Sequence, residues 1–393
     1  MKKIFTFAAA ALVMAACSKE PVQTPVKDFQ APAEKAEKKA VEFRSNVTVS
    51  MGSKAQGGVD AWSGSQNLYV YGFQRVSGAI DYATATPFIN NVVAVSPSGA
   101  TSDNSITVLD ETDGKPYYYV GNFTYDFYGY YVDDLDAEPR AEQTGIYVPL
   151  TLTGGEDIMI AKADPSVDVQ KAKDAGQFRG DLATWNDRYA YSAYAARRGV
   201  QPSLVFKHQL VRFTFQITSG SEFESNNRLV VKGLSLEARN VADLCVAGEN
   251  IGLCNINSTK QTLSLKSLSR GALGDLVEYV VPNASDVIEE GSNVIGESLM
   301  VIPNETPAAG QTDKYSMILT MEQDGKTINY PVDLEFSDVT ETPAGQTKFT
   351  AGYSYRITIK VYGLEDVDLS AELEPWVPGG NIEIDTDDAP EIL

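Results

Sequence analysis

Apolar and polar residues alternate along much of this 393-residue chain, and the alternation predicts its secondary structure. The first such run spans residues 41–51, and its apolar face is interrupted only by Ser45. That face comprises Val41, Phe43, Val47, Val49 and Met51. A period of two predicts a half-buried β-strand. The strand ends at a small, polar segment, residues 52–58, in which the Lys54–Ala55 bond is a target for a trypsin-like protease. Such a strand can be structural at first and removable later.

The alternation returns in many later segments. Runs that predict strands cover residues 67–73, 89–95, 146–152, 157–163, 203–218, 355–361 and 367–373. Residues 315–336 alternate on both sides of an Asp324–Gly325 turn, which predicts a hairpin. Residues 164–202 have no clean period and predict a short helix or a long loop.

These patterns predict an all-β fold. The chain has 20 Tyr, 31 Gly and 18 Pro and no long amphipathic helix, which favours strands joined by turns. Its length favours about two domains. We therefore expect two β-sandwiches in tandem, an N-terminal domain at residues 41–202 and a C-terminal domain at residues 203–380, followed by an acidic tail at residues 381–393.

The N-terminus predicts export. Lys2 and Lys3 precede an uncharged apolar run, residues 4–16, which is too short to span a bilayer. The run ends in VMAACS, which resembles a bacterial lipobox with Cys17 as the lipidated residue, although plain secretion is the alternative. One lipid would tether a soluble domain to a membrane. Residues 18–40 are rich in Pro, Lys and Glu and predict a disordered tether.

Charge and composition exclude several partners. The net charge is −21, and removal of residues 1–54 takes away 9 basic and 5 acidic residues, leaving 23 against 48, or −25. This charge argues against a nucleic acid. A single His and no cysteine pair at zinc spacing predict no metal and no cofactor.

Cys245 and Cys254 lie nine residues apart and are expected to form a local disulfide, with two free thiols as the alternative.

No pattern points to catalysis. The lone His208 lacks a recognisable nucleophile or carboxylate partner in the sequence, so we expect a packed or hydrogen-bonded structural residue and no enzyme. The aromatic stretch YYYVGNFTYDFYGYY, residues 117–131, has two interpretations. Its rings could form an exposed row for stacking on sugars, but packing in a sandwich core is favoured.

The sequence of residues 349–380, FTAGYSYRITIKVYGLEDVDLSAELEPWVPGG, resembles the C-terminal signature of the fimbrillin family, the lipoprotein-derived subunits of type V pili. The shared elements are a Phe-x-x-Gly-x-x-Tyr run leading into a strand, a second strand, and a Trp followed by Gly. The lipobox, YDFYGYY, DIMIA and the Phe206-Lys207-His208 stretch agree in order with this resemblance.

The resemblance implies two transthyretin-like, Greek-key sandwiches and a maturation step. In such subunits an Arg- or Lys-specific protease releases the first strand, and a C-terminal segment of a neighbouring subunit fills the groove. Here the matching bond is Lys54–Ala55, with Arg44 as the second candidate. The donor is expected in residues 377–393, where Ile382 and Ile384 alternate with polar residues.

These expectations define a function. The resemblance implies a structural subunit of an adhesive surface pilus, anchored by lipid in the outer membrane, with other pilus subunits and the processing protease as partners. The alternative is an uncleaved cell-surface lipoprotein whose β-domains bind glycan or host protein.

Overall fold

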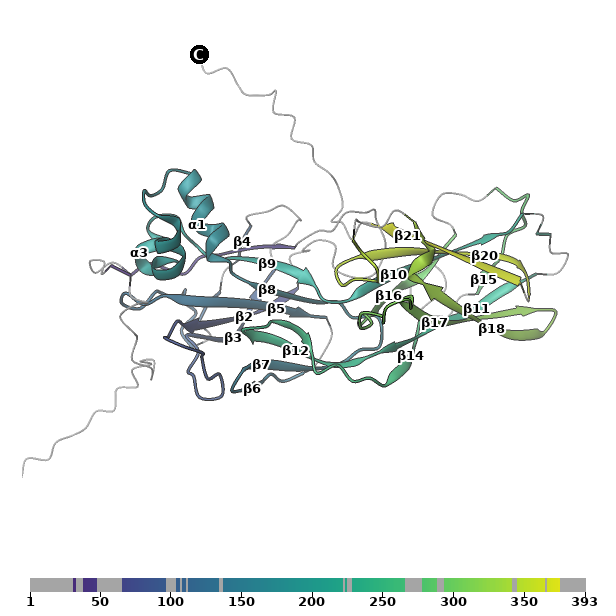
Figure 1. Ribbon diagram of the computed structural model, residues 1–393, viewed down its shortest axis with the longest axis horizontal. Coiled ribbons are helices and arrows are strands. Elements are labelled where there is room, and N and C mark those ends of the chain that lie inside the picture. Colours follow the sequence, from purple (N-terminus) through teal and green to yellow (C-terminus); the bar gives the residue numbers. More distant parts are fainter. Residues whose placement is uncertain are drawn as a thin grey trace, which may run out of the picture.

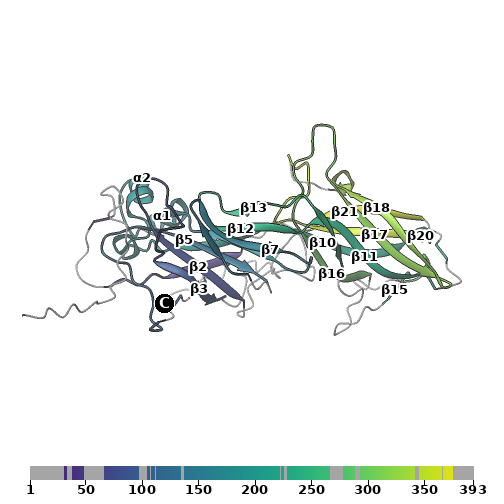
Figure 2. The ribbon, with the colours of Figure 1, turned by 90° about the horizontal axis from the view of Figure 1, so that it is seen from below.

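The computed structural model describes most of the chain after residue 65. The described ranges are 31–32, 38–47, 66–96, 104–106, 108–110, 112–133, 137–221, 223–224, 228–265, 278–287, 293–340, 345–364 and 366–374. Within them the strands form four sheets, two in each half of an elongated molecule (Figure 1). The two halves lie end to end in both views (Figure 2). The expectation of a predominantly β fold is confirmed.

A seven-stranded sheet forms the middle layer of the N-terminal half, in the order β3-β2-β5-β8-β9-β1-β4. Its strands are β1 (Phe43–Val47), β2 (Asn67–Gln74), β3 (Ile89–Val95), β4 (Asn104–Ile106), β5 (Tyr125–Val132), β8 (Ile158–Lys162) and β9 (Ser203–His208). A four-stranded sheet covers one face of it, in the order β13-β12-β7-β6. Those strands are β6 (Arg140–Glu142), β7 (Gly145–Thr151), β12 (Val241–Gly248) and β13 (Gly252–Cys254).

Helices cover the other face of the seven-stranded sheet (Figure 1). They are α1 (Pro165–Asp174), α2 (Leu182–Thr184), the π-helical turn η2 (Trp185–Tyr189) and α3 (Ala193–Ala196). Asp164 caps α1, because its Oδ1 accepts a hydrogen bond from the Ser166 backbone N–H at 2.9 Å. The irregular stretch of the sequence is therefore a helical layer, and Val169 and Trp185 carry its apolar contribution to the core.

Two five-stranded sheets enclose a separate core in the C-terminal half. One has the order β16-β10-β20-β21-β19, and the other has β14-β11-β17-β18 with β15 on β11. The strands are β10 (Val211–Ser219), β11 (Val230–Arg239), β14 (Lys260–Ser264), β15 (Tyr279–Val280), β16 (Val294–Val301), β17 (Lys314–Gln323), β18 (Lys326–Glu335), β19 (Val339–Thr340), β20 (Ser354–Gly363) and β21 (Asp366–Glu374), with the 3₁₀ turn η3 (Phe336–Asp338) after β18.

The predicted hairpin is present as β17 and β18. Gln323 pairs with Lys326 across the turn, and Asp324 and Gly325 have φ angles of 52° and 76°. Two successive positive φ angles match the right-handed twist of the strands and favour Asp-Gly at this turn. The sequence signal for the hairpin is confirmed.

The sheets depart from the expected boundary at residue 203. β9 begins there but pairs with β8 and β1 of the first sheet, and β12 and β13 return to pair beside β7. The chain crosses between the halves twice as nearly continuous extended chain, from β9 to β10 and from β11 to β12. Alternation predicts each strand but not its partner, so residues 203–208 and 241–254 were assigned to the wrong half.

Backbone hydrogen bonds and the buried His208–Asp157 pair hold together the region where the chain passes from one half to the other. Leu152 N–H donates to Asn240 O at 2.8 Å, and Met300 N–H donates to Gly154 O at 2.7 Å. His208 Nδ1 lies 3.0 Å from Asp157 Oδ1, and both side chains are buried. His208 is therefore the hydrogen-bonded structural residue that the sequence predicted.

The Glu156 carboxylate stabilises the loop at residues 153–156, which lies in the same region. Its Oε2 accepts hydrogen bonds from the backbone N–H groups of Thr153 at 2.8 Å and Gly154 at 3.0 Å, and its Oε1 accepts one from the Thr153 hydroxyl. Burial of the carboxyl opposes ionisation, but these donors outweigh it and lower the pKa of Glu156 below its usual 4.5. Folding therefore favours the ionised form.

The substitution Glu156→Gln is expected to lower the free energy of unfolding at neutral pH by about 1–3 kcal/mol, because backbone donors lose a charged acceptor. The wild-type contribution is full above pH 4.5 and disappears as the pH falls through the lower folded-state pKa, so the two proteins converge in acid. Denaturant unfolding at several pH values measures this difference. Glu237→Gln, at an exposed position on β11, is the matched control and should change little.

Candidate functional site: the first strand and its groove

β1 lies between β9 and β4 near one edge of the seven-stranded sheet. It runs parallel to β9, with Arg44 opposite Ser203 and Val47 opposite Phe206. It runs antiparallel to the three-residue strand β4, with Phe43 opposite Ile106. Because β4 is so short, β9 is the strand whose backbone β1 chiefly protects.

The residues before β1 add a second set of backbone contacts. Val41 N–H donates to Tyr117 O at 2.8 Å, and Tyr119 N–H donates to Lys39 O at 3.0 Å. Ala40 and Tyr118 form an antiparallel bridge between these two bonds. Residues 39–47 are thus held along their length by main-chain hydrogen bonds, which make few demands on side-chain identity.

Two side chains anchor the segment in the core. Phe43 is 0% exposed and Val41 is 5% exposed, whereas Glu42 and Arg44 between and beside them are exposed. The Phe43 ring packs edge-on against Phe127 on β5, with 5.1 Å between the ring centroids. The predicted alternation is confirmed over residues 41–44. The side chains further along the predicted face lie outside the described residues.

The start of β9, the strand beside β1, is held in place by contacts that do not involve β1. Asp168 on α1 accepts hydrogen bonds at Oδ2 from the Tyr191 hydroxyl at 2.6 Å and from the Ser203 backbone N–H at 2.9 Å. Burial raises the pKa of the Asp168 carboxyl, and the two donors act against this shift. The start of β9 is therefore fixed to the helical layer whether or not a strand lies beside it.

Most of the predicted processing residues lie outside the described residues. These are Cys17, Val49, Met51, Lys54, Ala55, Ile382 and Ile384. Arg44, the second candidate for cleavage, lies within β1, and its backbone N–H donates to Pro202 O at 3.0 Å. A protease needs an extended, unpaired backbone, so pairing protects the bond after Arg44 while β1 is in place.

The aromatic stretch is buried. Tyr125 and Phe127 face the helical layer, while Tyr128 and Tyr130 face the four-stranded sheet. All four are at most 3% exposed. The favoured interpretation as core packing is confirmed for residues 125–131, whereas Tyr117, Tyr118 and Phe123 are partly exposed.

The expected disulfide is absent from the structure, where Cys245 and Cys254 are free thiols. On the paired strands β12 and β13, Cys254 lies opposite Asp243 and Cys245 lies opposite Gly252. The cysteines are therefore diagonal neighbours, for which Cα atoms lie roughly 7–8 Å apart, too far for a bridge without backbone movement. Sequence spacing did not reveal this register.

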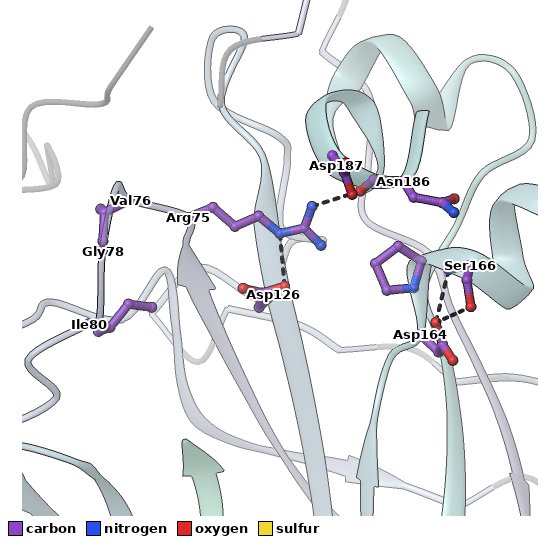
Figure 3. Close-up of a pocket in the computed structure, with 10 residues that line it drawn as sticks. Arg75, Val76, Gly78, Ile80, Asp126, Asp164, Ser166, Asn186 and Asp187 are labelled. Carbon is purple, nitrogen blue, oxygen red and sulfur yellow. Dashed lines mark hydrogen bonds and ion pairs between the residues drawn. The ribbon is translucent and has the colours of Figure 1, made fainter. Parts of the chain in front are cut away.

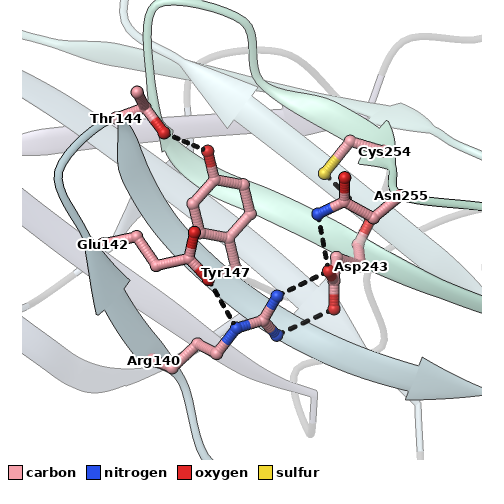
Figure 4. A network of polar contacts seen from close by, with 7 residues as sticks. All are labelled: Arg140, Glu142, Thr144, Tyr147, Asp243, Cys254 and Asn255. Atoms are coloured by element: carbon pink, nitrogen blue, oxygen red, sulfur yellow. Dashed lines mark hydrogen bonds and ion pairs between the residues drawn. The ribbon is translucent and has the colours of Figure 1, made fainter.

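A polar network beside these cysteines joins the strands of the four-stranded sheet (Figure 4). Arg140 on β6 donates from Nη1 and Nη2 to the two carboxylate oxygens of Asp243 on β12, at 2.8 and 2.5 Å. Asn255 Nδ2 donates to the same carboxylate at 2.8 Å. The hydrogen bond from Arg140 is the largest cause that lowers the pKa of Asp243. The network stabilises the sheet and was not predicted from the sequence.

An open pocket of about 720 Å³ lies between the end of β2 and the helical layer (Figure 3). Three of its polar lining residues are engaged within the protein. Arg75 Nε donates to Asp126 Oδ1 at 2.8 Å, Arg75 Nη1 donates to Asn186 O at 3.3 Å, and Asp164 caps α1. These contacts hold structural elements together and present no paired acid and base.

The described residues contain neither a metal-binding cluster nor a membrane-spanning helix. No group of three or more His, Cys, Asp or Glu side chains there is arranged to hold a metal ion. Within the same ranges, no helix is long and apolar enough to cross a membrane.

The chain belongs to the fimbrillin-like family, whose sequence profile matches residues 53–376. No curated protein sequence matches it. Among solved structures, it is similar to a putative cell adhesion protein from Bacteroides uniformis, with 14% identity, 86% and 98% of the two chains covered and a TM-score of 0.44. It is also similar to a fimbrial protein from Bacteroides vulgatus, with 14% identity, 86% of this chain and 100% of that chain covered, and a TM-score of 0.44. The tip fimbrial protein Mfa3 from Porphyromonas gingivalis has 10% identity, with 86% of this chain and 100% of that chain covered, and a TM-score of 0.35.

Replacing Phe43 with Ala should loosen β1. Loss of a fully buried ring is expected to cost about 3–5 kcal/mol of stability, and detachment of β1 should open the bond after Arg44 to trypsin. Limited proteolysis with mass detection measures the cut, and denaturant unfolding measures the stability. Glu42→Ala, at the exposed neighbouring position, is the control and should stay near wild type. Equal behaviour of the two variants would contradict the anchoring role of Phe43.

The two thiols should react slowly in the folded protein. Burial raises the pKa of Cys245 to about 11 and also raises the pKa of Cys254, which leaves little reactive thiolate near neutral pH. In a chain that begins at Ser18, which keeps only these two cysteines, iodoacetamide should label both rapidly only after denaturation. A chain that accepts no label until a reductant is added would carry the disulfide instead.

Proposed function

We propose that the protein is a subunit of a bacterial surface fimbria, exported as a lipoprotein and assembled by exchange of its first strand. In this proposal Cys17 carries the lipid anchor in the outer membrane, and an Arg- or Lys-specific protease cuts the Lys54–Ala55 bond. The segment that leaves includes β1, and a strand from a neighbouring subunit takes its place. Membership of the fimbrillin-like family supports this proposal.

The placement of β1 is the observation that carries it. β1 is the first strand in the chain, yet it lies inside the sheet between β9 and β4 and contributes a fully buried aromatic residue. A single cut at the Lys54–Ala55 bond, on the C-terminal side of β1, would separate this strand from the domain that follows it. Asp168 and the helical layer would keep the remaining groove in shape.

Removal of β1 would leave a strong demand for a new strand. The edge of β9 would lose its backbone partners, and Phe127, Ile106 and Phe206 would lose the apolar cover that Phe43 and its neighbours give. Unpaired strand edges and apolar clefts recruit strands from other chains. Burial of alternate apolar side chains at ~25 cal/mol per Å² would then make the joint durable.

The alternative function is an uncleaved surface lipoprotein that binds glycan or host protein. The interpretation that used the aromatic stretch loses most of its support, because the rings of residues 125–131 are buried. We therefore propose that adhesion is a property of the assembled fimbria, with β-strand exchange as the route to assembly.

Cleavage should convert monomers into polymers. A precursor without the lipidated cysteine, treated with a Lys- or Arg-specific protease, is expected to lose residues 1–54 and form a ladder on a native gel. Deletion of residues 377–393 should leave the cut monomer unable to extend the ladder. Mass spectrometry identifies the cut, and Lys54→Gln is the matched control that should prevent both cleavage and polymerisation.

A protein that is cut after Lys54 and stays monomeric would contradict this proposal. The uncleaved lipoprotein would then be the better account, and direct binding of sugars or host proteins by the monomer would be the next measurement.

A further inference from the structure

A groove of about 440 Å³ runs along β8 and β9 and reaches the start of α1. Alternate residues of β9 line it, namely Ser203, Val205 and Lys207, followed by Gln209. Ile160 and Lys162 on β8 form its floor beside them, and Ile160 lies directly opposite Lys207. Ile251, just before β13, lies at the end near Gln209. The groove is therefore built on the strand that β1 pairs with.

Two lysines give this groove a positive character in a strongly acidic protein. Lys162 and Lys207 are both exposed, and neither forms an ion pair within the described part of the chain. The Lys162 ammonium lies 5.1 Å from the centroid of the Tyr128 ring on β5, so it marks the border of the groove that is further from β1, whereas Lys207 lies on the strand next to β1. The net charge of the chain is −21, so two exposed lysines that line one groove have a sign opposite to that of the chain as a whole.

The carboxylates in the groove lie at its other end. Asp164 and Asp168 belong to the cap and first turns of α1, and their oxygens already accept hydrogen bonds from Ser166, Tyr191 and Ser203. An acidic strand would therefore be repelled near Ser203 and attracted near Lys207. The electrostatic potential along the groove therefore changes from negative near Ser203 to positive near Lys207.

The C-terminal tail has the complementary pattern. Residues 375–393 contain five acidic residues, Glu383, Asp385, Asp387, Asp388 and Glu391, and no lysine or arginine. Around Ile382 and Ile384 the acidic residues alternate with the apolar ones. In a strand, this spacing places Ile382 and Ile384 on one face and Glu383 and Asp385 on the other, whichever way the strand runs.

We propose that Lys162 and Lys207 are specificity determinants that select the acidic C-terminal tail of a neighbouring copy as the strand that replaces β1. This inference rests on the proposed function. With Ile382 and Ile384 directed into the core that Phe43 vacates, the acidic residues face outward on the side of β9 that carries Val205 and Lys207. Residues 41–51, with one Glu and one Arg, carry no net charge and gain nothing from the lysines. Exchange from the first strand to the tail therefore adds an electrostatic preference to the backbone pairing.

A labelled peptide of residues 377–393 tests this selection. The chain without the lipidated cysteine is cut with a Lys- or Arg-specific protease, and peptide binding is followed by fluorescence anisotropy. The double variant K162Q/K207Q is expected to bind roughly 2- to 5-fold more weakly, because Lys207 can form one exposed ion pair with the adjacent strand, while Lys162 lies one strand further away and acts at longer range. The difference should shrink at about 1 M salt, where the Debye length is about 3 Å. K360Q, at an exposed position on β20, is the matched control and should bind as wild type does.

A second peptide distinguishes the loss of charge interactions from a folding defect in the variant protein. A peptide with Glu383→Gln, Asp385→Asn and Asp387→Asn should bind wild type and K162Q/K207Q equally. Its neutral side chains no longer interact with the lysine charges, so removal of the lysines has no further effect on its affinity. A K162Q/K207Q variant that binds the acidic peptide as tightly as wild type overturns the role of the lysines but leaves strand exchange intact. A cut wild-type protein that binds neither peptide overturns strand exchange by the tail, and this inference with it.

Discussion

The insertion of β1 between β9 and β4 is the contact on which this account depends. It combines main-chain pairing, which accepts many sequences, with one buried anchor, Phe43, that demands a large apolar side chain. Main-chain pairing makes the site suitable for a replacement strand. The anchor makes an empty site costly, because Phe127 and its neighbours would face water.

Several contacts that hold the rest of the N-terminal half together do not depend on β1. Asp168 fixes the start of β9 to α1, and Arg140 with Asp243 stabilises the opposite sheet. Glu156, Asp157 and His208 hold the crossing point between the halves. None of these contacts involves β1, so the groove walls have their own support. In the proposed fibre, tension would pass from one subunit to the next through the inserted strand, so rigid groove walls would favour durability.

Local patterns predicted the parts of this structure that local physics decides. Alternation identified residues 41–44, Asp-Gly identified the β17–β18 turn, and the absence of a partner motif identified His208 as structural. Pairing between distant strands was beyond the sequence, so the place of β9, the return of β12 and the diagonal register of Cys245 and Cys254 differed from expectation. Lys162 and Lys207 lie 45 positions apart and face one groove only because β8 and β9 are neighbours, a pairing that no local pattern in the sequence reveals.

Hydrogen exchange at β9 tests the central claim most directly. If strand exchange operates, the amides of Ser203–His208 are slow to exchange in the precursor, become fast in the cut monomer once the released segment has been removed, and become slow again in the polymer. Protection of β20 in the C-terminal half should stay constant throughout. If the β9 amides remain equally protected after the cut, β1 has not left the sheet, and assembly by replacement of the first strand would be contradicted.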